Sequence, residues 1–148
     1  MIPLVLSIDD DQTSQILMRA YIKDEGFCTQ FVSKSDGQEA IDYLIDLAKA
    51  ASAQVWPDVI FLDISMPVLD GWGFLDGFAA LCSQHKKQPI VVMVSATNTP
   101  EDLARAKANP LVHSLTIKPI SHYAIEQLRQ LSSLRHFFET KHSCSVVK

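Results

Sequence analysis

Short apolar runs alternate with longer amphipathic segments along this chain. The apolar runs end in polar residues and are too short for helices of ordinary length, so they predict buried strands. These runs are residues 4–8, 27–32, 59–62, 90–95 and 111–117. Between them, apolar residues recur at every third or fourth position, which predicts helices. The expected helices cover residues 13–25, 37–47, 72–83, 100–109 and a last segment from about 124 onward.

Polar residues at the predicted helix starts support this division. A capping box joins either Ser35 with Gln38 or Asp36 with Glu39 at the start of the second helix. Pro100 suits the first turn of the fourth helix, where its missing N–H has no partner to lose. Strands and helices therefore alternate from one end of the chain to the other.

The alternation predicts an α/β fold with a doubly wound five-stranded parallel sheet. Strands that are apolar along their whole length are typical of parallel sheets covered by helices on both faces. The crossovers between such strands are right-handed. Ligands bind to such sheets just beyond the carboxyl ends of the strands, close to the point where the strand order reverses.

Polar residues stand at the carboxyl ends of four of the five predicted strands. They are Asp9, Asp10 and Asp11 after the first strand, Asp63 after the third, Ser95 after the fourth and Lys118 after the fifth. A strand order with the second strand at the outside brings these groups together. The pattern therefore predicts one polar site at one edge of the sheet.

The residue types in this predicted site favour phosphoryl chemistry. Carboxylates gathered at one place repel one another unless a positive charge intervenes, and Mg²⁺ (or Mn²⁺) prefers oxygen ligands. Lys118 adds a second positive charge and Ser95 a hydroxyl, which together suit the charged oxygens of a phosphoryl group. Asp63 is then expected to act as a nucleophile and to form an aspartyl phosphate.

Four sequence blocks resemble the receiver domain of bacterial-type response regulators over about residues 3–132. They are SIDDDQTS, FLDISMPVLDG, VMVSAT and IKP, in this order. The resemblance implies a flavodoxin-like (βα)5 fold with strand order 2-1-3-4-5. It also assigns residues 1–132 to the receiver domain and leaves residues 133–148 as a C-terminal helix extension or tail.

The same resemblance implies a metal site around the phosphoacceptor. Asp63 matches the phosphorylated aspartate, and Asp9 and Asp10 match the acidic pair that holds the metal ion with it. Ser65 matches the position whose backbone carbonyl completes the metal shell. The expected cofactor is Mg²⁺ or Mn²⁺.

The remaining site residues follow from the other two blocks. Ser95 and Ala96 match the phosphoryl-binding switch positions, and Lys118 matches the lysine that contacts the phosphoryl group. The catalytic set implied by the resemblance is Asp63, Lys118 and Ser95. The family pattern also implies a cis peptide before Pro119, and X–Pro bonds are the ones in which cis is accessible.

One position departs from the family pattern. Receivers often carry an aromatic residue three positions before the motif lysine, and this aromatic residue changes rotamer when the domain switches. The corresponding residue here is Leu115. The site chemistry is expected to remain, whereas the usual route from the site to the fourth helix and fifth strand is in question.

A phosphatase of the haloacid dehalogenase type is the main alternative. Asp9, Asp11 and Thr13 spell its D-x-D-x-T nucleophile motif after an apolar strand. Ser95 and Lys118 fit its second and third motifs, but no acidic pair follows the lysine to form the fourth. That interpretation also leaves the block FLDISMPVLDG unexplained. A receiver-like module that binds partners without phosphorylation is a further alternative.

The interpretation favoured by the sequence is a single-domain signalling switch. The resemblance implies a sensor histidine kinase or a histidine phosphotransfer protein as phosphodonor and a downstream protein as target. The chain is expected to assist its own phosphorylation and dephosphorylation and not to act as an enzyme on external substrates. Because Met1 lies just before the first strand, a piece cut from a larger protein is disfavoured.

Composition and charge narrow the partners and the location. The net charge of -4 and the lack of a basic region argue against nucleic-acid binding. The chain contains no apolar run of membrane-spanning length and no recognisable export signal, so a cytoplasmic location without membrane contact is expected. Cys28, Cys82 and Cys144 lack disulfide or zinc spacing, and the first two are expected to be buried. The five histidines show no metal-ligand spacing.

Overall fold

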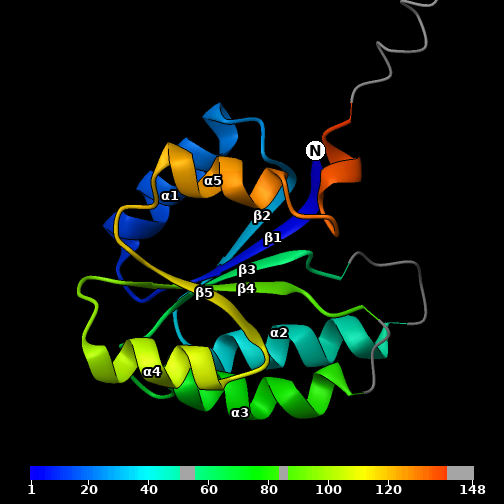
Figure 1. The fold of residues 1–148 in the computed structure, drawn as a ribbon. Coiled ribbons are helices and arrows are strands. Elements are labelled where there is room, and N and C mark those ends of the chain that lie inside the picture. Colours follow the sequence, from blue (N-terminus) through cyan, green and yellow to red (C-terminus); the bar gives the residue numbers. More distant parts are fainter. Residues whose placement is uncertain (51–55, 84–86, 140–148) are drawn as a thin grey trace, which may run out of the picture.

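The computed structural model describes residues 1–50, 56–83 and 87–139, and it contains a five-stranded parallel sheet in the order β2-β1-β3-β4-β5 (Figure 1). The strands are β1 Ile2–Ile8, β2 Cys28–Lys34, β3 Val59–Asp63, β4 Ile90–Ser95 and β5 Val112–Ile117. The helices are α1 Gln12–Asp24, α2 Gly37–Lys49, α3 Gly71–Cys82, α4 Pro100–Ala108, α5 His122–Arg129 and the 3-10 helix η1 Arg135–Phe137. The predicted fold class and strand order are confirmed.

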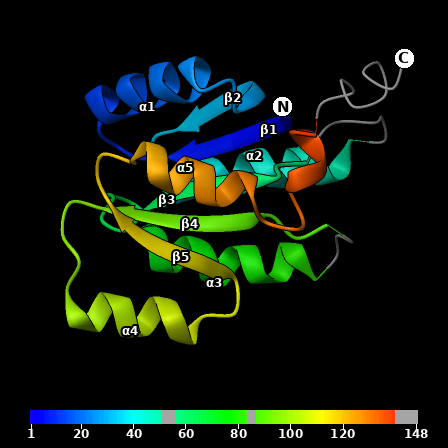
Figure 2. The same cartoon turned by 45° about the horizontal axis from the view of Figure 1, so that its top comes forward.

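Helices cover both faces of the sheet. α1 and α5 lie on one face, and α2, α3 and α4 lie on the other (Figures 1 and 2). Because the sheet lies between two helical layers, the side chains on both faces of its central strands are buried. This burial explains why the central strands are apolar along their whole length.

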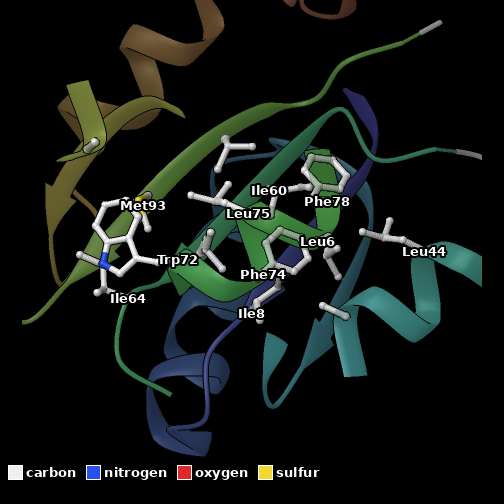
Figure 3. Close-up of a cluster of buried hydrophobic side chains, with 14 of the residues drawn as sticks. Leu6, Ile8, Leu44, Ile60, Ile64, Trp72, Phe74, Leu75, Phe78 and Met93 are labelled. Atoms are coloured by element: carbon white, nitrogen blue, oxygen red, sulfur yellow. The ribbon is translucent and has the colours of Figure 1, made fainter. Parts of the chain in front are cut away.

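Alternate residues of the central strands contribute to two separate hydrophobic clusters. On the α2–α3 face, Leu6 and Ile60 belong to the cluster that includes Phe74 and Phe78 of α3 (Figure 3). On the α1–α5 face, Phe61 belongs to a cluster with helix residues such as Ile22 and Ile125, as well as neighbouring strand residues. Neighbouring residues of one strand therefore pack against opposite helical layers. A slip of one residue would turn every side chain to the wrong layer, so this packing fixes the register of the sheet.

Side-chain caps define where the helices begin. Asp36 caps α2 by accepting a hydrogen bond from the backbone N–H of Glu39 at 2.9 Å. The Glu39 carboxylate in turn accepts from the backbone N–H of Ser35 at 3.2 Å. Of the two expected pairs, Asp36 with Glu39 therefore forms the cap. Asp11, Asp70, Thr99 and Ser121 cap the other four α-helices.

The C-terminal part of the described chain differs from a continuous last helix. α5 ends at Arg129, and η1 follows after a turn. Leu134 is nevertheless only 3% exposed, and the Phe138 ring stacks on that of Phe27 with 5.5 Å between centroids. Of the two alternatives for the segment after residue 132, a continuation of α5 is not formed over the described residues 133–139. These residues instead pack against the hydrophobic cluster on the α1–α5 face.

The cysteines are less buried than expected. Cys28 and Cys82 are partly exposed free thiols, and desolvation raises the pKa of Cys28 to about 11. Cys144 lies outside the described residues. Neither described cysteine is therefore poised as a reactive thiolate near neutral pH.

The described helices include none that is both long and apolar enough to cross a membrane.

The burial of Leu134 leads to a test of whether the segment after residue 132 belongs to the domain. Leu134→Ala removes a side chain from the α1–α5 cluster, so the free energy of unfolding should fall by about 2–5 kcal/mol in a urea titration. Leu17→Ala is the matched control, because Leu17 is 61% exposed and its loss should have little effect. Equal effects of the two substitutions would exclude residues 133–139 from the folding unit.

Candidate functional site

The polar residues singled out by the sequence meet at the carboxyl edge of the sheet. Asp63 is the last residue of β3, while Asp9 and Asp10 follow β1 directly. The strand order makes β1 and β3 neighbours, and one carboxylate oxygen from each of the three residues lies within 4.8 Å of the others. The predicted convergence of the acidic residues is therefore observed.

Lys118 provides the positive charge of this acidic group. Its Nζ lies 2.7 Å from Oδ2 of Asp9 and 3.4 Å from Oδ2 of Asp63. Partial burial alone would lower the pKa of Lys118, but the hydrogen bond to Asp9 and the nearby acidic charges raise it above its ordinary value. The Lys118–Pro119 peptide is cis, as the resemblance implied.

The ionised form of Asp63 is unfavourable in the folded protein, and Lys118 compensates for this only in part. The residue is 8% exposed. Burial first, and the charge of Asp9 second, raise the pKa of Asp63 to about 6, whereas the charge of Lys118 opposes the shift. In the described site, three carboxylates face one ammonium group. The arrangement therefore favours a further cation with oxygen ligands.

Asp9 and Asp11 have their carboxylates occupied by local contacts. Oδ1 of Asp9 accepts a hydrogen bond from the backbone N–H of Asp11 at 2.9 Å, and its Oδ2 faces Lys118. Asp11 is the N-cap of α1, as expected, and accepts from the backbone N–H groups of Thr13 and Ser14. Backbone hydrogen bonding, with Ser14 first, lowers the pKa of Asp11. Asp11 therefore stabilises the helix start.

The loop between β3 and α3 is held tightly beneath the site. The N–H of Gly71 donates to the carbonyl of Ile64 at 2.8 Å, and a Cβ at residue 71 would lie 2.5 Å from the carbonyl oxygen of Asp63. Only glycine permits this close approach of α3 to the end of β3. The close approach fixes the backbone that carries Asp63.

Val68 gives this loop a strained turn. Its φ is +67°, and the N–H of Leu69 donates to the carbonyl of Pro67 at 2.7 Å, which forms a γ-turn around Val68. γ-turns with positive φ are rare, and a β-branched residue is disfavoured in this conformation. Ser65, the expected carbonyl ligand, is exposed in the same loop. Its metal role stays a prediction.

The fourth and fifth strands supply the other expected site residues. Ser95 is 8% exposed at the end of β4, and its Oγ accepts a hydrogen bond from the N–H of Thr97 at 3.3 Å. The carbonyl of Ser95 also accepts from the N–H of Lys118 at 2.8 Å. Ala96 follows in the exposed loop. Leu115 packs, partly buried, against the cluster on the α2–α3 face.

Sequence reasoning missed Gln15, a residue of α1 whose amide reaches the ends of two strands. Nε2 of Gln15 lies 3.1 Å from the carbonyl oxygens of Ser7, Asp9 and Lys34. No motif contains this residue. The available signal was a glutamine in the first turn of a helix that follows the acidic residues.

A second cluster of side chains of the types that can bind metal was also not predicted from the sequence. Glu25, His122 and Glu126 offer ligand atoms within 4.8 Å of one another, and His122 Nδ1 lies 2.8 Å from Glu25. Arg129 contacts both glutamates and thereby compensates their charge. The hydrogen bond with His122 is the main cause that lowers the pKa of Glu25. This cluster is an ion-pair network that joins α1 to α5.

Comparisons with known proteins agree on one family. Residues 5–130 match the family model of the response regulator receiver domain. A similar curated sequence, the "Probable methanogenesis regulatory protein FilR2" of Methanothrix harundinacea, is 28% identical over 118 residues, which cover 80% of this chain and 73% of that protein. Another, protein-glutamate methylesterase/protein-glutamine glutaminase 5 of Myxococcus xanthus, is 31% identical over 129 residues. Those residues are 86% of this chain but only 33% of the longer relative.

Solved structures of similar shape carry related descriptions. A two component response regulator from Cytophaga hutchinsonii matches with a TM-score of 0.81 and 31% identity, over 90% of this chain and 98% of that chain. The chemotaxis protein CheY4 of Vibrio cholerae matches with a TM-score of 0.66 and 25% identity, over 88% and 98% of the two chains.

The raised pKa of Asp63 predicts how the metal-free protein responds to pH. The ordinary pKa of 3.8 applies to the unfolded chain and about 6 to the folded one, so the folded state binds more protons between these values. The free energy of unfolding should therefore fall as the pH rises through this window. Asp63→Asn removes the charge and should be the more stable protein near about pH 8, by up to about 3 kcal/mol.

Urea titrations of both proteins with a chelator present test this expectation. The stability difference should shrink as the pH falls from about 6 towards 3.8, because Asp63 is then protonated in the folded state and increasingly protonated in the unfolded state. Asp76→Asn is the matched control, since Asp76 is an exposed acid on α3 and lies outside the acidic cluster. A difference that stays constant across the range would contradict the assigned pKa.

Proposed function

This chain belongs to the response regulator receiver domain family, and we propose that it is a Mg²⁺-dependent switch phosphorylated on Asp63. The observation that carries the proposal is the position of Asp63 at the end of β3, with carboxylate oxygens of Asp9 and Asp10 within 4.8 Å and Lys118 Nζ at 3.4 Å. A carboxylate in this setting has both candidate cation ligands and an ammonium group beside it. Both features suit a nucleophile that must meet a highly charged phosphoryl group.

The residues present fit a bound Mg²⁺ or Mn²⁺. Asp9, Asp10 and Asp63 would hold it through carboxylate oxygens, and Ser65 through its backbone carbonyl. The raised pKa of Asp63 is consistent with this assignment, because burial first and the charge of Asp9 second make its carboxylate unfavourable, and a divalent cation would offset both. A bound divalent cation supplies charge compensation for the phosphoryl oxygens.

Asp63 is a better candidate for the nucleophile than Asp9. Both oxygens of Asp9 are engaged, one by the N–H of Asp11 and the other by Lys118 at 2.7 Å. Asp63 has the longer contact to Lys118, at 3.4 Å. Asp11, the second acid of the dehalogenase-type motif, caps α1 here. These contacts favour the switch over a phosphatase that uses Asp9.

Lys118 and Ser95 are the proposed partners of the phosphoryl group. Lys118 would bind one of its oxygens as an ammonium donor, and the raised pKa keeps that group charged. The Ser95 hydroxyl, which only accepts in its described hydrogen bond to Thr97, would donate to a second oxygen. The exposed backbone at Ala96 would follow Ser95 when this contact forms. The phosphoryl charge would thereby shift the loop after β4.

The phosphodonor is proposed to be a sensor histidine kinase or a histidine phosphotransfer protein, and the output a contact with a downstream protein. The chain is proposed to assist its own phosphorylation and dephosphorylation in the cytoplasm, without turnover of external substrates. The Myxococcus relative is described as a methylesterase and glutaminase, but this chain spans about a third of its length. No esterase activity is therefore carried over to this chain.

Phosphorylation by a small donor is the direct test. With Mg²⁺ and acetyl phosphate, the unmodified protein should gain one phosphoryl group in intact-mass spectrometry, and Asp63→Asn should gain none, because the nucleophilic carboxylate is gone. Asp76→Asn should be phosphorylated like the unmodified protein, since Asp76 is exposed on α3 and away from the acidic cluster. A chelator should abolish the mass gain.

The same preparations distinguish the switch from a phosphatase. A switch should release little phosphate from an unrelated ester such as p-nitrophenyl phosphate. Sustained hydrolysis of that ester that is lost in Asp9→Asn but retained in Asp63→Asn would overturn the proposed function.

A further inference from the structure

Gln15 closes the carboxyl ends of β1 and β2. The three carbonyls that it contacts lie at or near the ends of these strands: Ser7 within β1, Asp9 just after β1, and Lys34 as the last residue of β2. One amide nitrogen of Gln15 lies 3.1 Å from the carbonyls of Ser7 and Asp9 on one chain segment and of Lys34 on the other. A side chain from α1 therefore joins the ends of the two strands, in addition to the Asp9 N–H that already donates to the Lys34 carbonyl at 3.0 Å.

The orientation of this amide is determined by what surrounds it. With the amide reversed, Oε1 of Gln15 would face the three carbonyl oxygens, which is repulsive. In the observed orientation Oε1 is buried and has no hydrogen-bond partner in the described structure. A buried acceptor without a partner is costly, so the hydrogen bonds of the two Nε2 protons, which are shared among three carbonyls, must outweigh this cost. Position 15 therefore requires a side chain that can donate hydrogen bonds.

The contact with Gln15 gives the last of the polar groups of Asp9 a hydrogen-bond partner. Its N–H donates to the carbonyl of Lys34 at 3.0 Å, its Oδ1 accepts from Asp11, and its Oδ2 contacts Lys118. Its carbonyl is the remaining polar group, and Gln15 is the residue that binds it. Each polar group of Asp9 is thus held by a different residue.

We propose that Gln15 is a positioning residue for the cation site, holding the backbone of Asp9 against the end of β2 so that the Asp9 and Asp10 carboxylates face Asp63. This inference rests on the proposed function, since it assumes that these carboxylates bind a cation. Residues that orient metal ligands typically change metal affinity by about 10–100-fold when they are replaced. Gln15 acts through Asp9 and does not itself touch the cation.

Gln15→Met tests this role, because methionine has similar length and flexibility but no donor. Isothermal titration of the full chain with Mg²⁺ should give a dissociation constant about 10-fold weaker than that of the unmodified protein. Gln12→Met is the matched control, since Gln12 is exposed in the same helix turn and should leave the constant unchanged. The rise of the urea midpoint with Mg²⁺ gives the same constant even for a weakly folded variant, because the ion binds the folded state.

Gln15→Glu separates positioning from charge. An added negative charge near the site would by itself strengthen Mg²⁺ binding, and Gln12→Glu measures that effect on the same helix. If Gln15 positions Asp9, Gln15→Glu should bind Mg²⁺ more weakly than Gln12→Glu, because a carboxylate cannot donate to the three carbonyls.

The outcomes distinguish this inference from the function on which it rests. If Gln15→Met binds Mg²⁺ as tightly as the unmodified protein and differs only in the free energy of unfolding, Gln15 is structural and the inference fails alone. If the unmodified protein binds no Mg²⁺, the proposed function fails and the inference falls with it.

Discussion

Mutual repulsion of three carboxylates is the constraint on which the functional end of this protein depends. The parallel sheet brings Asp9, Asp10 and Asp63 together whether or not their charges are compensated, because each follows directly from a strand end. Lys118 reduces the repulsion, yet burial and the charge of Asp9 still raise the pKa of Asp63 to about 6. The surrounding fold therefore keeps the three carboxylates close together despite their mutual repulsion.

The sequence predicted most of this architecture because buried parallel strands have a simple signature. β4 and β3 are apolar along their whole length, so their positions and types follow from hydrophobicity alone. Once strands and helices alternate, topology directs every strand's carboxyl end to one edge. Asp63 and Lys118, about a third of the chain apart, were placed together by that rule. The cis peptide before Pro119 followed only from family resemblance, since proline permits cis without requiring it.

Other features depend on three-dimensional packing that no local pattern encodes. Leu134 has the spacing of a continued helix, yet α5 ends at Arg129 and the chain turns to reach the core. Arg129 contacts Glu25, a residue just after the end of α1. The two residues are far apart in the sequence, so no local spacing pattern could predict this ion pair. The same holds for Gln15, whose three acceptors lie on two strands. Such contacts can be found only when the register of neighbouring elements is known.

The γ-turn at Val68 has a consequence for how this protein would change under selection for heat resistance. A non-glycine residue in the left-handed region costs on the order of 1–3 kcal/mol. The Val68 side chain is 82% exposed, so a smaller residue there would give up little burial. Glycine or asparagine at this position offers a short mutational route to a more thermostable protein with an unchanged core. The loop after the phosphoacceptor is therefore where a heat-adapted lineage would first be expected to diverge.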